Sequence, residues 1–370
     1  MKIGILTTIV GSNQTSGLYN SQQIGIAKQF DEYFEKVLVY IAVPMDKQRR
    51  DTAIKECKNT IVCEIPTKQI GNNGLFDCDQ LDTTIDYLLY FSDMQQVIPK
   101  VSRWCRNHQV ELLLYTGVIE SHSNSTVKRI ISSLLFRQTA KSYKKHISIA
   151  KTPYVFEKMK KKGIQPQAIV PVGLDTSLLK QDSLLYSESE LKVKYGFGED
   201  EKVLLFIGRM VEEKQPVRMI EIFHDIYQKD EKYRLIMVGT GPLLDKVKRM
   251  AAEGHLPITF YDAVYNKDIW ELYRISEAYV NLNQQEIFGM AILEAMYYEC
   301  KVVAWHAPGP DYIIEDRVSG LLADSNEEVV EKILHGTISG TEGKNRVIQS
   351  FTWEASARKI MEMICFSRMK

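Results

Sequence analysis

Two cationic residues in the C-terminal half have the spacing of groups that bind a phosphorylated ligand. Arg209 follows the apolar run Val203 to Gly208, and Lys214 comes five residues later, just before Gln215-Pro216. An arginine offers a planar fork to phosphate oxygens, whereas a lysine supplies a compact point charge. The pair therefore predicts a loop that holds a diphosphate and neutralises its charge as it leaves. The competing interpretation is two solvated loop charges that pair with the neighbouring Glu212 and Glu213.

Two glutamates downstream form a second candidate group. Glu286 follows the apolar run Ala278 to Asn283, and Glu294 comes eight residues later, about two helical turns on. The residues between them, Phe288, Gly289, Met290 and Ala291, open a predicted helix whose free N–H groups can bind phosphate. The carboxylates can accept hydrogen bonds from sugar and ribose hydroxyls. The apolar run around Glu294 favours this role over a solvated glutamate on an amphipathic helix, because an unpaired carboxylate would be costly there.

These residues follow strands of a predicted α/β fold. Apolar, β-branched runs alternate with helix-length segments in both halves of the chain, beginning at Lys2, Lys36, Ile61, Tyr87 and Glu111, and again at Lys202, Tyr233, Pro257, Ala278 and Lys301. The pattern predicts two doubly wound, Rossmann-like domains, residues 1–175 and 176–352, that face each other across a cleft. Residues 353–370 are expected to form a helix that packs back on the N-terminal domain. The carboxyl ends of parallel strands are where such folds bind ligands.

The C-terminal half resembles the retaining GT-B glycosyltransferases of the family 4 (group 1) type. The resemblance is carried by Gly208-Arg209 with Lys214 and by five segments that follow in order, namely Val238 to Pro242, Ile258 to Val264, Glu286 with Glu294, Ala307 to Pro310, and Ser319 to Leu322. It implies that Arg209 and Lys214 stabilise the departing diphosphate, that Glu286 contacts the donor sugar, and that Glu294 binds the ribose hydroxyls. It also implies that Gly239, Gly241 and Val264 flank the base. No metal or other cofactor is expected, because the two cations and the helix end replace it.

The N-terminal half matches the family in outline, and the resemblance implies that it binds the acceptor while the C-terminal domain binds the nucleotide sugar. The loop after the first strand carries Gly11 and Gly17, which can make tight turns near the donor phosphates, and which are equally compatible with a plain surface loop. Relatives often place a histidine after an N-terminal strand, close to the anomeric carbon. Here Glu120 or His122 occupies that neighbourhood and is the candidate on the acceptor side, although a histidine in a polar loop is more often incidental.

Composition limits the setting in which the protein works. Hydrophobic residues make up 45% and charged residues 25% of the chain, no apolar run is long enough to span a membrane, and the six cysteines form no metal or disulfide pattern. Residues 100–170 carry 14 Lys and Arg against three acidic residues. Residues 127–146 read either as a basic amphipathic helix on an anionic membrane or as a helix packed on its own sheet. We expect a cytoplasmic protein with no nucleic-acid partner. If residues 127–146 lie on a membrane, the protein would be peripheral at its inner face.

The sequence thus predicts a retaining glycosyltransferase. It would move a hexose or N-acetylhexosamine from a nucleotide diphosphate sugar, with a UDP-sugar preferred from its prevalence among relatives, to a glycan or lipid-linked acceptor. The setting would be bacterial-type surface polysaccharide or glycoconjugate synthesis. Two alternatives stay open, namely a GT-B sugar-nucleotide epimerase and a non-catalytic sugar-nucleotide-binding subunit of a glycosylation complex.

Overall fold

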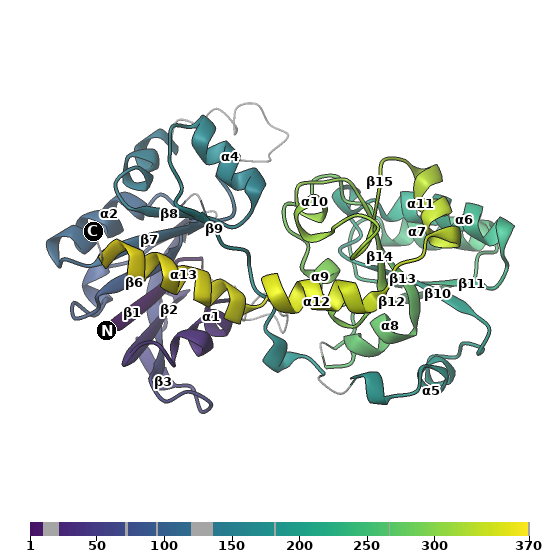
Figure 1. Ribbon diagram of the computed structural model, residues 1–370, viewed down its shortest axis with the longest axis horizontal. Helices are drawn as coiled ribbons and strands as arrows, with labels where there is room; N and C mark the ends of the chain where they lie inside the picture. The colour runs from purple at the N-terminus through teal and green to yellow at the C-terminus, as the bar shows by residue number, and fades with distance from the viewer. Residues whose placement is uncertain are drawn as a thin grey trace. The chain divides into compact units, whose positions relative to one another are not determined.

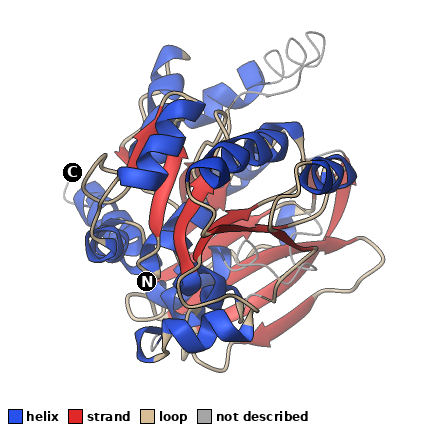
Figure 2. Cartoon of the chain, turned by 90° about the vertical axis from the view of Figure 1, so that its right-hand side faces the viewer, coloured by secondary structure: helices blue, strands red, loops and turns tan. Residues whose placement is uncertain are grey.

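The chain folds into two compact α/β units. The computed structural model describes residues 1–9, 22–70, 73–93, 95–119, 136–180, 183–265 and 267–368. Unit 1 contains residues 1–175 and 353–370, and unit 2 contains residues 176–352 (Figure 1). Each unit is built on a largely parallel sheet with helices packed against it (Figure 2). The α/β fold class expected from the alternating apolar runs is therefore confirmed.

Unit 1 has a sheet in the order β3-β4-β2-β1-β6-β7-β8-β9, with β5 paired to β4. The strands are β1 (Lys2–Thr7), β2 (Lys36–Pro44), β3 (Arg50–Ala53), β4 (Thr60–Ile70), β5 (Asn73–Leu75), β6 (Tyr87–Phe91), β7 (Glu111–Thr116), β8 (Ile147–Ala150) and β9 (Ala168–Ile169). The helices are α1 (Gln22–Phe30), α2 (Ile98–Asn107), 136–143, α4 (Pro153–Lys161) and α13 (Trp353–Arg368). The central strands are buried almost throughout, as parallel strands covered on both faces must be.

Unit 2 has six parallel strands in the order β12-β11-β10-β13-β14-β15. The strands are β10 (Lys202–Ile207), β11 (Tyr233–Val238), β12 (Ile258–Tyr261), β13 (Ser276–Asn281), β14 (Lys301–Trp305) and β15 (Leu321–Ala323). The helices are α5 (Glu188–Lys194), α6 (Pro216–Lys229), α7 (Leu244–Glu253), α8 (Ile269–Ile275), α9 (Met290–Tyr297), α10 (Pro310–Ile313), α11 (Asn326–His335) and α12 (Gly340–Ser350). Numbered from β10, this is the 3-2-1-4-5-6 strand order of a doubly wound Rossmann sheet.

Two strands of unit 2 differ from the sequence expectation at their ends. The strand expected over Ala278 to Asn283 ends at Asn281, because the Asn281 side chain accepts a hydrogen bond from the Asn283 N–H (3.1 Å) and turns the chain. The apolar run that begins at Pro257 forms a strand over Ile258–Tyr261, and β11 offers no further partner beyond Tyr261. Within the described ranges, no helix has the length and apolar character needed to cross a membrane.

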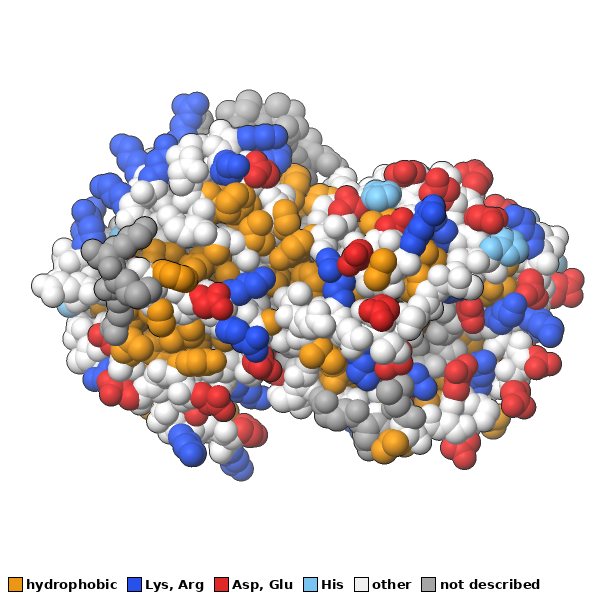
Figure 3. Space-filling model, in the orientation of Figure 1, with side chains coloured by type: hydrophobic (Ala, Val, Ile, Leu, Met, Phe, Trp, Pro, Cys, Tyr) orange, Lys and Arg blue, Asp and Glu red, His pale blue; other side chains and the backbone are white. Residues whose placement is uncertain are grey.

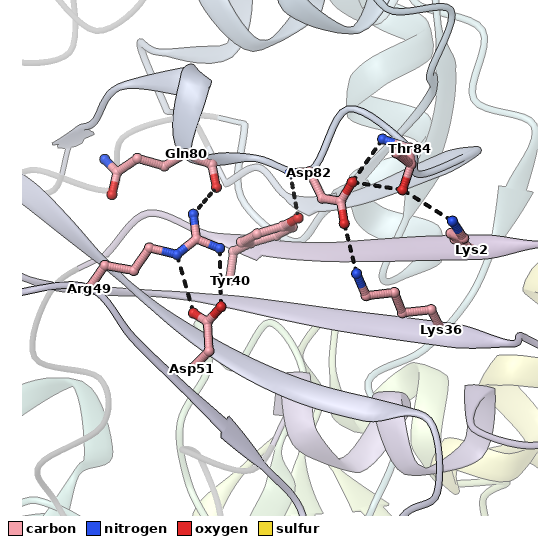
Figure 4. Close-up of polar contacts among 8 residues, drawn as sticks. All are labelled: Lys2, Lys36, Tyr40, Arg49, Asp51, Gln80, Asp82 and Thr84. Atoms are coloured by element: carbon pink, nitrogen blue, oxygen red, sulfur yellow. Dashed lines mark hydrogen bonds and ion pairs between the residues drawn. The ribbon is translucent and has the colours of Figure 1, made fainter.

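A polar cluster fixes the edge of the unit 1 sheet where β3 pairs with β4 (Figure 4). Arg49 donates hydrogen bonds to Asp51 and to the Gln80 carbonyl, and Asp82 accepts from Lys36 (2.8 Å). Burial opposes ionisation of Asp82, but the hydrogen bonds from Lys36 and Thr84 outweigh it and lower the pKa of Asp82 to about 2. Lys2 and Lys36 stand at the amino ends of their strands, so this part of the cluster lies at the edge opposite to the carboxyl ends. We assign it a structural role.

Helix α13 closes unit 1 by packing against α1. Trp353 begins this helix and is 2% exposed, and a Cβ added to Gly25 would lie 2.3 Å from the Trp353 ring. Gly25 is thus the point at which α1 approaches the indole most closely. The Ser356 hydroxyl in the next turn of α13 donates to the Pro171 carbonyl (2.8 Å), which ties the helix to the end of the sheet segment.

Substituting Gly25→Ala is expected to destabilise unit 1. Alanine favours a helix over glycine by about 1 kcal/mol, but overpacking a rigid buried ring costs about 1–3 kcal/mol. Calorimetric melting should therefore show a lower melting temperature. Gly198→Ala is the control, because its new methyl would meet the Glu201 side chain no closer than 3.6 Å. A Gly25→Ala protein as stable as the control would contradict the packing of α13 on α1.

Candidate active site

The candidate residues of unit 2 gather at the carboxyl edge of its parallel sheet. β10 and β13 are neighbours, but the chain leaves β10 toward β11 and leaves β13 toward β14. The strand order therefore reverses between β10 and β13, which is where doubly wound sheets bind ligands. The loop after β10 carries Arg209 and Lys214, and the loop after β13 carries Glu286.

An ion pair joins these two loops. Lys214 Nζ lies 2.5 Å from Glu286 Oε2, with the two side chains 27% and 14% exposed. The Asn283 amide donates to the same carboxylate oxygen (3.1 Å), and the Asn283 carbonyl accepts from the Glu286 N–H (3.2 Å). The interpretation of Lys214 as a solvated charge paired with Glu212 or Glu213 is therefore wrong. Its partner is the glutamate across the switch point.

Arg209 takes a different position. Its guanidinium lies 3.8 Å from Glu213 and is 74% exposed, so the contact is a weak surface pair. A side chain held this loosely can turn toward an arriving ligand at little energetic cost.

The backbone of the loop after β10 is fixed by the loop after β11. The Met210 N–H donates to the Thr240 carbonyl (2.8 Å), and the Met210 carbonyl accepts from the Leu243 N–H (2.9 Å). Gly239 has φ +138°, and a Cβ there would lie 2.0 Å from the Gly208 carbonyl oxygen. A Cβ at Gly241 would likewise lie 2.5 Å from the Met210 carbonyl oxygen. Both glycines are thus required for the loops to meet, whatever they do toward a ligand.

The start of α9 provides the backbone donors of the site. Gly289 precedes the helix in a left-handed conformation (φ +110°), and its carbonyl accepts from the N–H groups of Ile292 and Leu293. Phe288, Met290 and Ala291 border this end of the helix. The Glu286 carbonyl accepts from the Gly309 N–H (2.7 Å), and Gly309 packs against the Phe288 backbone so closely that a Cβ would lie 2.1 Å from its oxygen. The helix end therefore has a fixed position beside the ion pair.

Glu294 is buried in the second turn of α9. It is 8% exposed, and one of its oxygens accepts a hydrogen bond from the Tyr273 hydroxyl (3.0 Å). Burial raises the pKa of Glu294 to about 7, and the hydrogen bond from Tyr273 opposes that rise. Burial, with Glu294 nearby, also raises the pKa of Tyr273, so its hydroxyl keeps the proton that it donates.

The remaining sequence candidates fall into two groups. Val264 lies half-buried in the segment after β12, beyond the carboxyl end of that strand. Gly11, Gly17, Glu120 and His122, as well as residues 127–135 of the basic segment, lie outside the described residues. Sequence reasoning missed Asn283 and Tyr273, which hold the two glutamates. A buried asparagine just past an apolar strand was a usable signal for the first, whereas Tyr273 carries no local signal.

One Asp-x-Asp triplet, Asp77 to Asp79, occurs in unit 1. In the structure Asp77 accepts a hydrogen bond from the Asp79 N–H (3.3 Å) and lies 3.7 Å from Lys100, so it caps a short helical turn in unit 1. Within the described part of the chain, no group of three or more His, Cys, Asp or Glu side chains is placed to hold a metal ion.

The arrangement defines a class of protein. Two Rossmann-like units occur in one chain, and the second has a cation, a carboxylate and a helix end at its switch point, which together can bind a diphosphate and the hydroxyls of a sugar. The whole chain matches solved GT-B glycosyltransferases. It superimposes on HepE from Anabaena, solved in complex with UDP and glucose, with a TM-score of 0.69 and 16% identity over 99% of both chains. Sucrose-phosphate synthase from Thermosynechococcus elongatus gives 0.72 and 15% identity, over 100% of this chain and 99% of that one. The fold is GT-B.

Sequence comparison points to the same class. Residues 187–363, in the C-terminal half of the chain, match the model described as "Glycosyl transferases group 1". An alpha-monoglucosyldiacylglycerol synthase from Acholeplasma laidlawii is 26% identical over 216 residues, 55% of this chain and 54% of that protein. A poly(ribitol-phosphate) alpha-N-acetylglucosaminyltransferase from Staphylococcus aureus is 24% identical over 173 residues, 44% of this chain and 35% of that protein. The chain thus aligns with about half or less of these relatives' lengths.

Substituting Glu294→Gln is expected to stabilise the protein at neutral and higher pH. The folded-state pKa of about 7 lies above the usual 4.5, so folded protein binds the proton more tightly than unfolded chain, and stability falls as pH rises from about 4.5 to about 7. The full effect above pH 7 is on the order of 3 kcal/mol. The melting temperature of Glu294→Gln should therefore exceed that of the wild type at pH 8 and converge with it near pH 4.5. The exposed Glu253→Gln serves as control, and a pH-independent difference for Glu294→Gln would contradict the assignment.

Proposed function

We propose that this protein is a retaining glycosyltransferase that moves a hexose or N-acetylhexosamine from a UDP-sugar to a glycan or lipid-linked acceptor. The observation that carries the proposal is the Lys214–Glu286 ion pair beside the start of α9, at the switch point of a domain that matches the group 1 glycosyltransferase model. The preference for uridine is supported by HepE, which was solved with UDP and with UDP-glucose. The acceptor class is supported by the names of relatives that act on diacylglycerol and on poly(ribitol-phosphate).

The proposed mechanism uses the charges of unit 2. The Lys214 ammonium has three N–H donors, so it can keep Glu286 and still donate to a phosphate oxygen. Arg209 turns in from the surface, and the N–H groups at the start of α9 complete an anion site for the leaving diphosphate. Donors fixed before the reaction stabilise charge that develops as the sugar leaves. No metal takes part in this scheme.

The two glutamates have separate roles in this scheme. Glu286, held by Lys214 and Asn283, accepts hydrogen bonds from hydroxyls of the donor sugar, and Glu294 accepts from the ribose hydroxyls. Burial shields the Glu294 carboxyl group from water. The ribose hydroxyls would donate hydrogen bonds in place of water, so ligand binding favours the carboxylate form. The acceptor hydroxyl attacks the anomeric carbon from the same face as the leaving phosphate. The bond from that carbon to the phosphate oxygen breaks, the leaving phosphate takes the hydroxyl proton, and the configuration is retained.

The rival interpretations predict different turnover. An epimerase would convert the UDP-sugar without an acceptor, and a silent subunit would bind UDP without consuming the sugar nucleotide. Incubation with UDP-glucose and UDP-N-acetylglucosamine, with analysis of every nucleotide and sugar product, separates the three. Slow release of free sugar and UDP that disappears in Glu286→Ala supports the transferase.

Substituting Lys214→Met is expected to lower kcat for transfer by about 10²–10³-fold, as removal of one fixed donor to a developing charge does. The KM for the acceptor should stay unchanged, because the side chain belongs to the donor side. Lys246→Met, an exposed lysine on α7, is the matched control. Transfer by Lys214→Met at the rate of that control would rule out the leaving-group role.

The proposal includes contact with an anionic membrane surface. Arg137, Lys141, Lys144 and Lys145 are exposed on and just after the helix 136–143, and Figure 3 shows blue side chains gathered over this upper part of unit 1. Each such cation contributes on the order of 1 kcal/mol near an anionic surface. A lipid-linked acceptor would be presented at such a surface.

Liposome sedimentation measures this contact. The wild type is expected to bind vesicles of phosphatidylglycerol at low salt and to be released at high salt, because the attraction is screened. Replacing Lys141, Lys144 and Lys145 by glutamine should reduce binding by more than tenfold, whereas glutamine at Lys246, Lys248 and Arg249 of α7 should have no effect. Equal binding by both triple variants would exclude this surface.

A further inference from the structure

Unit 1 carries a charged pair of its own at the carboxyl edge of its sheet. Asp93 follows β6, Gly117 follows β7 and Lys151 follows β8, and these three strands are parallel neighbours. The three residues therefore emerge side by side. The strand order of unit 1 reverses between β1 and β6, so Asp93 stands next to the switch point of this sheet.

The contacts of Asp93 and Lys151 fix both side chains. Lys151 Nζ lies 2.9 Å from Asp93 Oδ2, and it stands over the rings of Phe91 and Tyr115, at 5.1 and 4.9 Å from their centroids. The other oxygen, Oδ1, accepts hydrogen bonds from the N–H groups of Gly117 (2.5 Å) and Val118 (3.2 Å). The aspartate thus accepts from two strand ends at once.

The two members of the pair differ in their exposure to solvent. Lys151 is 7% exposed, whereas the Asp93 side chain is 26% exposed. A Cβ at Gly117 would lie 2.7 Å from Lys151 Cδ and 3.4 Å from Asp93 Oδ1, so the backbone closes directly over the lysine stem. Burying an ion pair costs desolvation that apolar side chains of similar volume avoid. Stability alone therefore gives no reason for this pair.

A layer of hydroxyl groups supports the pair. The Ser92 and Thr116 hydroxyls are 2.6 Å apart, and the Tyr143 hydroxyl lies 3.0 Å from Ser92 and 3.2 Å from Thr116. All three side chains are buried, and they join the ends of β6 and β7 to the helix 136–143. These hydrogen bonds fix the strand ends from which Asp93 and Gly117 emerge, and a rigid base of this kind is typical of a binding site built in advance of its ligand.

We propose that Asp93, held in place by Lys151, accepts hydrogen bonds from hydroxyl groups of the acceptor, so that unit 1 recognises a neutral sugar or polyol. The inference rests on the proposed function and names the acceptor chemistry. A hydroxyl can donate to the exposed carboxylate, whereas the lysine lies against Gly117 and the two rings. An anionic acceptor group fits poorly, because the lysine charge is already compensated and a phosphate would meet the carboxylate beside it.

The test uses the full chain and the double variant Asp93→Asn, Lys151→Met, which removes both charges so that neither is left buried alone. Wild type and variant are compared for UDP affinity by calorimetry, for hydrolysis of UDP-glucose without acceptor, and for acceptor KM with methyl glucoside, N-acetylglucosamine, glycerol and dioleoylglycerol micelles. The variant is expected to raise the acceptor KM about tenfold to a hundredfold, the loss of a charged hydrogen bond. UDP affinity and hydrolysis should stay within twofold.

Saturation-transfer NMR on the wild type adds a readout that needs neither turnover nor a folded variant. Transfer to at least one of these neutral ligands that inorganic phosphate does not compete away supports the inference. No transfer to any of them, or a wild-type acceptor KM in the double variant, overturns it. So does an equal loss in Glu157→Gln, Lys160→Met, an exposed ion pair on α4 (3.1 Å). A wild type that neither binds UDP nor hydrolyses UDP-glucose refutes the proposed function alone, and the NMR result still decides this inference.

Discussion

The ion pair between Lys214 and Glu286 is the contact on which the site in unit 2 depends. At the switch point the chain leaves β10 and β13 in opposite directions, so no backbone pairing holds their two loops together. The salt bridge between the partly exposed Lys214 and Glu286 side chains holds the two loops together instead. With 27% and 14% exposure the pair keeps much of its attraction without the full cost of desolvation. An anion entering the switch point meets a lysine whose direction is already set.

The residues around this ion pair form a rigid backbone framework, and one of them, Glu294, lowers the stability of the folded protein. Gly239, Gly241 and Gly309 let neighbouring loops touch backbone to backbone, so the loop after β10 and the start of α9 have little freedom. Glu294 sits against that framework in surroundings that favour its protonated form. A carboxylate retained at a position where it lowers the stability of the folded protein is the kind of local conflict that functional sites tolerate.

The sequence predicts features that depend on neighbouring residues, but not contacts between residues that are far apart along the chain. The strands of both units were predictable because continuous apolar, β-branched runs are typical of buried parallel strands. Lys214 and Glu286 were predictable as members of a site, because each follows such a run. Their contact with each other was not, since it depends on β10 and β13 being neighbours, and strand order leaves no local pattern. The same holds for Tyr273, which reaches Glu294 from another helix, and for Asp93 and Lys151, which are 58 residues apart.

Each sheet has a charged pair at its carboxyl edge, and the two pairs differ in exposure. In each sheet a lysine forms an ion pair with a carboxylate, and the exposure of the ammonium determines which kind of ligand can bind there. Lys214 is open enough for a second anion to share it, so unit 2 suits a diphosphate. Lys151 is covered by Gly117 and by two aromatic rings, and what reaches the surface there is the carboxylate. A pair that presents a compensated carboxylate attracts hydroxyl donors and repels phosphate, so the same fold can separate a charged donor from a neutral acceptor.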